Sequence, residues 1–369
     1  MILPREPIQR LTGATHGGVQ LHELQKLGLK RDEVMDFSIS ANPFQPPGSV
    51  VKAAHAVPIE AYPESRARRL QARLGELNGV SPASVAVVNG TSQALWLIAL
   101  SYLRPGDKVL TFPPTYGDYE MVSSMMGAEN VELRAREEAQ FRPPLSEAAD
   151  LLRREQFRIA WLCNPNNPTS TYLREEELEP LFEACGETET LLVLDEAYAS
   201  FNTSRFNSER LLTDYPVLLM RSMTKDFNLN ALRIGYILAS EPIARVIDRV
   251  QPPWSVNTPA EEAGLAALKE LAFYSESWRK TEVLTEELGR AIEELGFTRY
   301  PAGCNFQLFR GPEELHLPEK LWKKGIKIRD CSSFGLPGYF RVGTRPRRDN
   351  RRLVEAIGEV YSIGSGSPR

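Results

Sequence analysis

Short apolar runs alternate with longer segments of mixed polarity between residues 85 and 220, and this alternation constrains the fold most strongly. Buried strands that alternate with helices are typical of an α/β protein with a mostly parallel sheet covered on both faces. Ligands of such sheets bind at the carboxyl ends of the strands, so chemistry is expected there. The expected strands are Val85–Val88, Lys108–Thr111, Val131–Leu133, Arg158–Leu162, Leu191–Leu194 and Val217–Met220.

Both ends of the chain depart from this alternation. A length of 369 residues exceeds a typical single core, which favours two lobes. The alternation of expected strands and helices stops after Pro252-Pro253, and a long helical region from Ala260 to Leu295 follows. We expect an N-terminal arm that is part of the small domain and the active site (residues 1–45), a large domain (46–255), a small α+β C-terminal domain (256–363) and a disordered tail (364–369).

Composition narrows the functional classes. The formal net charge of −4, with acids and bases interspersed, predicts neither a nucleic-acid partner nor a membrane surface. No run approaches a membrane span, and no signal peptide is expected at the start. Scattered cysteines without metal-ligand spacing predict reduced thiols, no metal site and a cytoplasmic location. These cysteines are Cys163, Cys185, Cys304 and Cys331.

Polar residues follow directly after several expected strands. Gly90-Thr91-Ser92 forms a turn at a helix N-terminus, which suits a phosphate group, although taken alone the segment favours an ordinary helix cap. Asp195 ends another strand, where a buried carboxylate would need a cationic partner unless it is a surface acid. Lys225 and Arg233 follow the last expected strand, and each alone suits a solvated surface charge. One cofactor, pyridoxal 5′-phosphate (PLP), needs all these groups together.

The sequence resembles the fold type I PLP enzymes of the class I and II aminotransferase family over nearly its whole length. The motifs are Asn-Asn-Pro-Thr at 166–169, Leu-Asp-Glu-Ala-Tyr at 194–198 and Ser-Met-Thr-Lys at 222–225, followed by Leu-Arg-Ile-Gly at 232–235. The resemblance implies an aspartate-aminotransferase-like fold, with a large domain around a mostly parallel sheet and a smaller α+β domain. It also implies PLP as the cofactor and a homodimer.

The resemblance assigns roles position by position. Lys225, Asp195 and Tyr116 are implied as catalytic: the lysine bonds the cofactor, the acid pairs with its pyridine nitrogen, and the tyrosine stacks on its ring. Asn167 and Tyr198 are implied to contact the ring hydroxyl. The implied phosphate contacts are Gly90, Thr91, Ser92, Ser222, Arg233 and, from a neighbouring subunit, Tyr62. Ala231 stands where the family usually has glycine, for which we expect a modest backbone adjustment.

Two subgroups are nearest in resemblance. The stretches at 15–18, 219–225, 253–257 and 328–331 resemble L-threonine-O-3-phosphate decarboxylase of cobalamin biosynthesis, which acts as a lyase. The expected reaction is therefore decarboxylation of L-threonine O-3-phosphate to 1-amino-2-propanol phosphate. The alternative is a histidinol-phosphate aminotransferase of histidine biosynthesis, or a related class I and II transferase, which the stretch 341–345 favours.

The expected substrate contacts depend on the same resemblance. Arg341 is expected to bind the substrate carboxylate, because a guanidinium fork matches its two oxygens. Arg329 and His16 are candidates for the substrate's phosphate, with Gly17 and Asn167 beside them. Two alternatives come from other classes. A PLP-binding transcription regulator would need an added DNA-binding domain, and the catalytic fold takes up this chain. An α/β binding protein without PLP would leave the set of sites unexplained.

Overall fold

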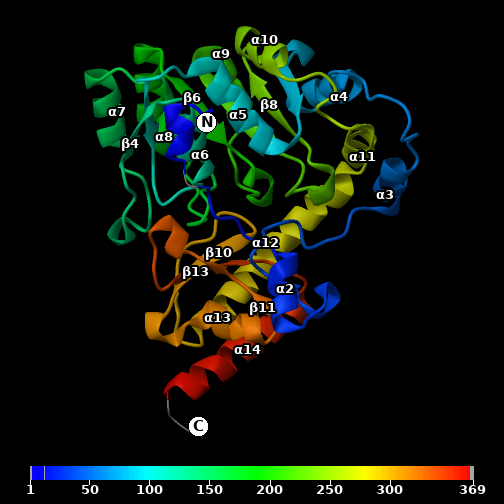
Figure 1. Ribbon diagram of the computed structural model, residues 1–369, viewed down its shortest axis with the longest axis vertical. Helices are drawn as coiled ribbons and strands as arrows, with labels where there is room; N and C mark the ends of the chain where they lie inside the picture. Colours follow the sequence, from blue (N-terminus) through cyan, green and yellow to red (C-terminus); the bar gives the residue numbers. More distant parts are fainter. Residues whose placement is uncertain (1, 12, 366–369) are drawn as a thin grey trace.

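The structure is a computed structural model that describes residues 2–11 and 13–365. Figure 1 shows an upper lobe built around one large sheet and a lower lobe around a smaller one. The helix α12 (Leu271–Glu293) runs from the upper lobe into the lower one. This arrangement matches the expected aspartate-aminotransferase-like α/β fold.

The upper lobe holds a sheet of seven strands within the described residues, in the order β2-β8-β7-β6-β5-β3-β4. Neighbours from β7 to β4 pair in parallel, and only β8 runs antiparallel to both strands beside it, so the sheet is mostly parallel. The strands are β2 (Val85–Val88), β3 (Lys108–Thr111), β4 (Glu129–Glu132), β5 (Ile159–Cys163), β6 (Leu191–Asp195), β7 (Val217–Ser222) and β8 (Gly235–Ala239).

The sheet is buried on both faces because alternate residues enter two different cores. Leu192 and Leu194 of β6 belong to one apolar cluster, whereas Leu191 and Val193 belong to the other. In a strand with both faces buried, every side chain enters a core, which is why these runs are continuously apolar rather than alternating between apolar and polar residues. The helices of this lobe are α3 (Gly48–His55), α4 (Arg68–Asn78), α5 (Gly90–Tyr102), α6 (Asp118–Met125), α7 (Leu145–Arg154), α8 (Glu175–Thr188), α9 (Leu211–Asp214), α10 (Glu241–Val250) and α11 (Thr258–Lys269).

The lower lobe is an α+β unit. Its antiparallel sheet has the order β12-β13-β10-β9, and α12, α13 and α14 contribute to the core beside it. Within the described residues the elements are β9 (Thr298–Arg299), β10 (Phe306–Arg310), β11 (Ile326–Lys327), β12 (Arg329–Asp330), β13 (Tyr339–Gly343), α13 (Leu317–Lys323) and α14 (Arg347–Ser365).

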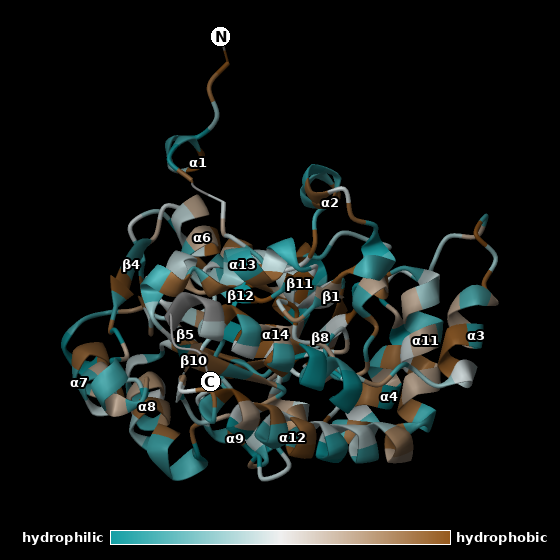
Figure 2. Cartoon of the chain, turned by 90° about the horizontal axis from the view of Figure 1, so that it is seen from below, coloured by the Kyte–Doolittle hydropathy of each residue, from teal (hydrophilic) through white to brown (hydrophobic). Residues whose placement is uncertain are grey.

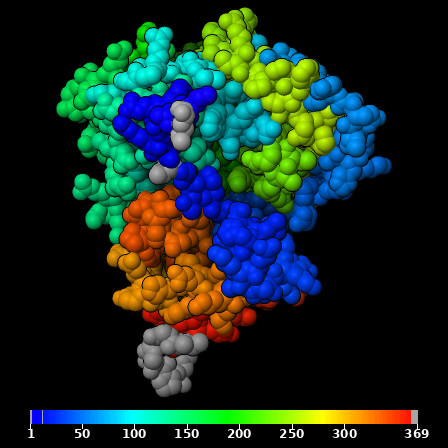
Figure 3. All heavy atoms as spheres, in the orientation of Figure 1, coloured from blue at the N-terminus to red at the C-terminus, as the bar shows by residue number. Residues whose placement is uncertain are grey.

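The N-terminal arm contacts both lobes. Its helix α1 (Glu6–Gln9) lies beside α6 at the edge of the upper lobe, as Figure 2 shows. Its strand β1 (Met35–Asp36) pairs in parallel with β11 of the lower lobe, and Phe37 enters that lobe's core. The arm also contains α2 (Leu21–Leu27). Figure 3 shows the arm in dark blue on the surface of both lobes.

The two cores meet along α12. Tyr274, near its start, packs in the upper core, whereas Leu288 and Ile292 pack in the lower core. We therefore propose that the division between domains lies within α12 rather than between residues 255 and 256. Of the expected tail, 364–365 are the end of α14 and 366–369 lie outside the described residues. No helix in the described ranges is long and apolar enough to cross a membrane.

Candidate active site

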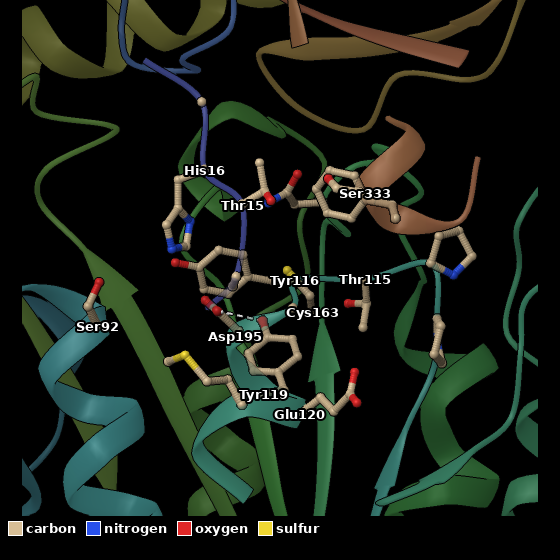
Figure 4. A pocket seen from close by; sticks show the side chains of 18 of the residues that line it. Thr15, His16, Ser92, Thr115, Tyr116, Tyr119, Glu120, Cys163, Asp195 and Ser333 are labelled. Atoms are coloured by element: carbon tan, nitrogen blue, oxygen red, sulfur yellow. Dashed lines mark hydrogen bonds between the residues drawn. The ribbon is translucent and has the colours of Figure 1, made fainter. Parts of the chain in front are cut away.

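A cavity of about 610 Å³ opens between the two lobes and the arm. The carboxyl ends of β5 and β6 and the loop after β7 form its floor, while β12, β13 and arm residues close it from the other side. Figure 4 shows His16 and Thr15 of the arm lying across this cavity from Asp195 and Cys163. Most of the expected site residues line it: Thr91, Ser92, Tyr116, Asn167, Asp195, Tyr198, Lys225, Arg233, Arg329, Arg341, His16 and Gly17.

Lys225 follows β7 and faces the cavity. Its Nζ has no hydrogen-bond or ion-pair partner among the described residues. Burial, together with the positive charges of Arg341 and Arg233, lowers the pKa of Lys225 to about 8. A lysine with a lowered pKa has more of the neutral amine near neutrality, which is the nucleophilic form.

Asp195 ends β6 with its carboxylate at the cavity floor. One oxygen accepts a hydrogen bond from the Tyr119 hydroxyl at 2.7 Å and the other from the Ala197 amide at 3.0 Å. Burial raises the pKa of Asp195 to about 6, although both hydrogen bonds oppose the rise. No cation of residues 2–11 and 13–365 forms an ion pair with it. A buried carboxylate without a cation therefore faces the cavity, as a protonated pyridine nitrogen requires.

Aromatic side chains cover the neighbouring wall. The ring of Tyr116 lies edge-on to Tyr119, with centroids 5.6 Å apart, and 5.8 Å from the imidazole of His16. Tyr198 packs edge-on against Phe306 at 4.9 Å. Burial raises the pKa values of Tyr116 and Tyr198, so both phenols remain neutral hydrogen-bonding groups. Figure 4 shows the Tyr116 ring directly above Asp195.

The start of α5 and Arg233 form a cationic corner. Gly90 has φ +71°, and a Cβ there would lie 2.9 Å from Nη2 of Arg233, so only glycine lets the guanidinium approach the helix N-terminus. The dipole and free amides of a helix N-terminus favour a phosphate group. Ser222 itself is buried behind the cavity wall, and its hydroxyl hydrogen-bonds that of Thr224 at 2.5 Å.

The unpartnered lysine, the buried acid and the cationic corner fit PLP. The lysine would hold the cofactor covalently, Asp195 would face its ring nitrogen and the corner its phosphate. Ala231 lies in a short 3₁₀ turn before Arg233, which still reaches the cavity.

Two arginines lie opposite each other on the lower lobe's sheet. The antiparallel register of β12 and β13 pairs Arg329 with Arg341, and both line the cavity. Nη2 of Arg341 donates to the Ser38 carbonyl at 2.7 Å, and Nη1 donates to Oδ1 of Asn167. Arg329 donates to the Thr15 carbonyl and the Ser333 hydroxyl, each at 2.7 Å. Neither arginine forms an ion pair with a carboxylate of the described chain.

The arm residues expected at the site are present in the cavity wall. Nε2 of His16 lies 3.4 Å from Oδ1 of Asp118, and about half of the imidazole is exposed. A Cβ on Gly17 would lie 2.4 Å from the Ser38 carbonyl oxygen, so the close packing of the arm on itself requires glycine. His16 thus lies beside Tyr116, whereas the backbone of Thr15 contacts Arg329.

Tyr62 is outside the cavity. Its side chain is 82% exposed and contacts only Trp254 among the aromatic rings of the described residues, with centroids 5.0 Å apart. Its expected role in a neighbouring subunit stays a prediction.

Several residues of the cavity were not expected. Tyr119, Thr224, Ser38 and Cys163 all line it. Thr224 lies inside the Ser-Met-Thr-Lys motif, and Tyr119 lies three positions after Tyr116. Their nearness to expected site residues could have indicated both from the sequence. Ser38 comes from the arm and Cys163 from the end of β5, and no local pattern distinguishes them.

A family model for aminotransferase class I and II matches residues 32–357. The chain belongs to this family. It is a PLP-dependent enzyme of the aminotransferase type, and PLP is its cofactor. A histidinol-phosphate aminotransferase of Symbiobacterium thermophilum is 34% identical over 98% of this chain and 95% of that protein. A second, from Archaeoglobus fulgidus, is 32% identical over 89% of this chain and 93% of that protein.

Solved structures give the same fold. The histidinol-phosphate aminotransferase of Sinorhizobium meliloti, in complex with PLP, superposes with a TM-score of 0.86 at 24% identity, covering 97% of each chain. The aspartate aminotransferase of Thermus thermophilus, with maleate, gives 0.81 at 23% identity, covering 98% of this chain and all of that one. At these identities the likeness establishes the fold alone.

The expected decarboxylation of threonine phosphate is wrong, and with it the expected lyase activity and cobalamin role. The similar curated proteins are histidinol-phosphate aminotransferases. The L-threonine-O-3-phosphate decarboxylase of Porphyromonas gingivalis superposes at a TM-score of 0.74 and 26% identity, over 87% of this chain and 98% of that one. One of the stretches used, 219–225, ends at Lys225, which the resemblance to the whole PLP family already implied, so it did not distinguish the two subgroups.

Proposed function

We propose that the protein is a histidinol-phosphate aminotransferase that takes its amino group from a dicarboxylic amino acid such as glutamate. The names of curated relatives at 34% and 32% identity, matched over most of both chains, support this substrate. The single observation that carries the proposal is the opposed pair Arg329 and Arg341 at the cavity, with no acid paired to either in the described chain.

This arginine pair suits two different anions. Like charges directly opposite each other on antiparallel strands repel, so the arrangement favours a ligand that brings negative charge between them. In histidinol phosphate a CH₂–O–phosphate group stands in place of the α-carboxylate of an amino acid. One site must therefore bind a phosphate in one half-reaction and a carboxylate in the other. Arginine forks bind both anions with two parallel hydrogen bonds.

The remaining residues supply proton transfer and orientation. Bound PLP supplies the electron sink that makes the substrate's Cα–H bond acidic. Asp195 would hold the proton on the ring nitrogen of the bound cofactor, because the carboxylate is ionised above its pKa of about 6. Lys225, with a pKa near 8, accepts the Cα proton as a neutral amine and can return it. Asn167 and Tyr198 would contact the ring hydroxyl of the bound cofactor, and Gly90, Thr91, Ser92, Thr224 and Arg233 would hold its phosphate.

We also propose a homodimer in a cytoplasmic location. Tyr62 lies outside the lining of its own cavity and is largely exposed, as expected if it completes the site of a neighbouring subunit. The four cysteines are free and buried, which agrees with a reducing compartment.

The half-reactions test the substrate. Holoenzyme mixed with L-glutamate alone should form 2-oxoglutarate in an amount equal to the bound cofactor and then stop. Histidinol phosphate together with 2-oxoglutarate should turn over continuously, whereas histidinol without phosphate should react far more slowly. Carbon dioxide released from threonine phosphate over many turnovers, without any reaction of glutamate, would contradict the proposal.

A matched pair of variants tests the arginine site. Arg329→Met removes one cation from the pair and should raise the KM for histidinol phosphate about 10- to 100-fold, because a charged hydrogen bond contributes roughly 1.5–3 kcal/mol. Arg310→Met, on β10 of the same sheet, removes an exposed arginine that pairs with Glu137 and should leave the KM unchanged. Equal effects of the two changes would exclude a specific phosphate contact.

A further inference from the structure

The peptide of Lys225 is held from the N-terminal arm by a single asparagine. The backbone N–H of Asn42 donates a hydrogen bond to the carbonyl oxygen of Lys225 at 2.8 Å. Its side-chain Nδ2 donates to the carbonyl oxygen of the next residue, Asp226, also at 2.8 Å. We propose that Asn42 is a positioning residue that fixes the backbone from which the Lys225 amine reaches the cofactor.

The side chain of Asn42 is fixed by several hydrogen bonds at once. The residue is 3% exposed, and each of its side-chain atoms has a partner. Oδ1 accepts from the Phe44 amide at 3.0 Å, and Nδ2 donates a second bond to the Ser277 hydroxyl at 2.8 Å. A buried amide that is completely satisfied adopts one orientation, so it is suited to hold another backbone segment in place.

The backbone contacts matter because the side chain of Lys225 is not held by any hydrogen bond of its own within the described residues. Nζ of Lys225 is unpartnered within the described ranges, so the position of the amine depends on where its backbone is fixed. Displacements of a fraction of an ångström at a reacting atom change rates strongly.

The contact also joins three parts of the molecule. Ser277 and Trp278 belong to α12, and Nε1 of Trp278 donates to the same Asp226 carbonyl at 2.9 Å. Ser38, four residues before Asn42, accepts a hydrogen bond from Arg341. The segment from Ser38 to Asn42 therefore connects an arginine of the lower lobe with the peptide of Lys225. The inference concerns the lysine and holds for any amino-group substrate of this site.

The test compares Asn42→Ala and Asn42→Asp with Asn350→Ala. Asn42→Asp keeps the size and the acceptor for Phe44 but removes the Nδ2–H donors. Asn350→Ala removes another buried asparagine, which accepts from the Arg345 amide at the start of α14, far along the chain from Lys225. Both Asn42 variants should lower kcat on the order of tenfold, with KM nearly unchanged, at full cofactor occupancy. Asn350→Ala should lower thermal stability alone.

A measurement that needs no catalysis distinguishes displacement of the Lys225 amine from a general loss of stability. In cofactor-free protein, the pH midpoint for acetylation of Lys225, followed by peptide mass spectrometry, should shift in both Asn42 variants. It should stay unchanged in Asn350→Ala. An unchanged midpoint and kcat in the Asn42 variants, or equal shifts in all three proteins, would overturn the proposal.

Hydrogen exchange on the unaltered protein adds a test that needs no variant to fold. The backbone amide of Asn42 should be protected as strongly as the amides of β7, because Asn42 is buried and this amide donates to the Lys225 carbonyl. Rapid exchange of that amide would also overturn the proposal.

Discussion

Asp195 ends a fully buried strand, and two hydrogen bonds stabilise its charge in place of water. A carboxylate in such a setting gains stability from any cation that enters the cavity, because the desolvation cost has already been met in the folded protein. The acid is therefore arranged to favour the protonated form of the cofactor ring. Tyr119 contributes to this directly, since its hydroxyl is a donor to the ionised acid.

Tyr119→Phe should shift the acid limb of the pH–kcat/KM profile to higher pH. The change removes a donor that lowers the pKa of Asp195, so the acid becomes ionised only at higher pH. The ring should still stack on Trp161, whose centroid lies 5.5 Å away. Tyr102→Phe, at the end of α5, is the control. A profile of Tyr119→Phe that superposes on the parent's would show that Tyr119 does not tune the acid.

Asp226 should make folding stability depend on pH. Burial raises its pKa to about 7, while the hydrogen bond from Ser200 opposes the rise. Since the folded pKa lies above the unfolded value of about 3.9, this contribution is complete below about pH 4 and is lost as pH rises through about 7. Asp226→Asn should therefore reduce the fall in Tm between about pH 5 and about pH 8. Asp214→Asn, at an exposed position, should leave the fall in Tm unchanged. If Tm falls equally with pH in the parent and in both variants, Asp226 does not cause the pH dependence.

At the residue scale, the motifs around Lys225 and Asp195 carried the resemblance that implied their roles, and the structure places both residues at the cavity. Tyr119 and Asn42 were not predicted, because their partners lie 76 and 184 residues away in the chain. No local pattern reports which distant hydrogen bond a buried tyrosine or asparagine makes.

At the scale of elements, the ends of β6 and β7 are joined by a buried charge cluster just behind the site. Nε of Arg221 donates to Glu196 at 2.8 Å and Nη1 donates to Glu209 at 2.6 Å. The guanidinium and the Glu196 carboxylate are both less than a tenth exposed. Glu196 and Arg221 are the chain neighbours of Asp195 and Ser222, so the cluster fixes the two strand ends relative to each other.

Arg221→Leu should lower the free energy of unfolding by roughly 3–5 kcal/mol, because two carboxylates would remain buried without their cation. Arg153→Leu removes a surface arginine that pairs with Glu187 and should cost only about 0–1 kcal/mol. Urea unfolding monitored by circular dichroism measures both. Comparable losses in the two variants would show that the cluster does not hold the strand ends.

The strands of the parallel part were predictable because each is a continuously apolar run. The strand β8 was missed, although Gly235–Ala239 is equally apolar, because it follows the Arg233 motif without an intervening helix. Its antiparallel place between β2 and β7 depends on contacts between distant segments. The expected single helical region from 260 to 295 is two helices, separated at Glu270, whose φ of −103° departs from helical geometry.

At the scale of the whole molecule, the site is shared between lobes. The upper lobe contributes Lys225 and Asp195, the lower lobe contributes Arg329 and Arg341, and the arm closes the cavity. The sequence predicted two lobes but not their junction, because α12 is one uninterrupted helix whose two halves pack in different cores.

Mixing two inactive subunits tests the proposed homodimer. Sedimentation should give twice the chain mass of 41.5 kDa. Lys225→Ala and Tyr62→Ala should each have little activity alone. A hybrid dimer has one site with both native residues only if Tyr62 reaches the neighbouring site. Random exchange should then restore about a quarter of the parent's activity. If activity does not recover although mass spectrometry verifies the hybrid dimers, Tyr62 does not contribute to the site of the neighbouring subunit.

The pairing of Met35 with Ile326 has a consequence for how the protein is made. A ribosome releases the arm first, yet the strand that β1 needs emerges almost last. The upper core draws on residues between Val50 and Tyr274, so it can form while the remaining chain is still being translated. The nascent protein thus acquires the groups that hold PLP before it has either arginine of the substrate site. Translation itself delays catalysis until the final strands are released.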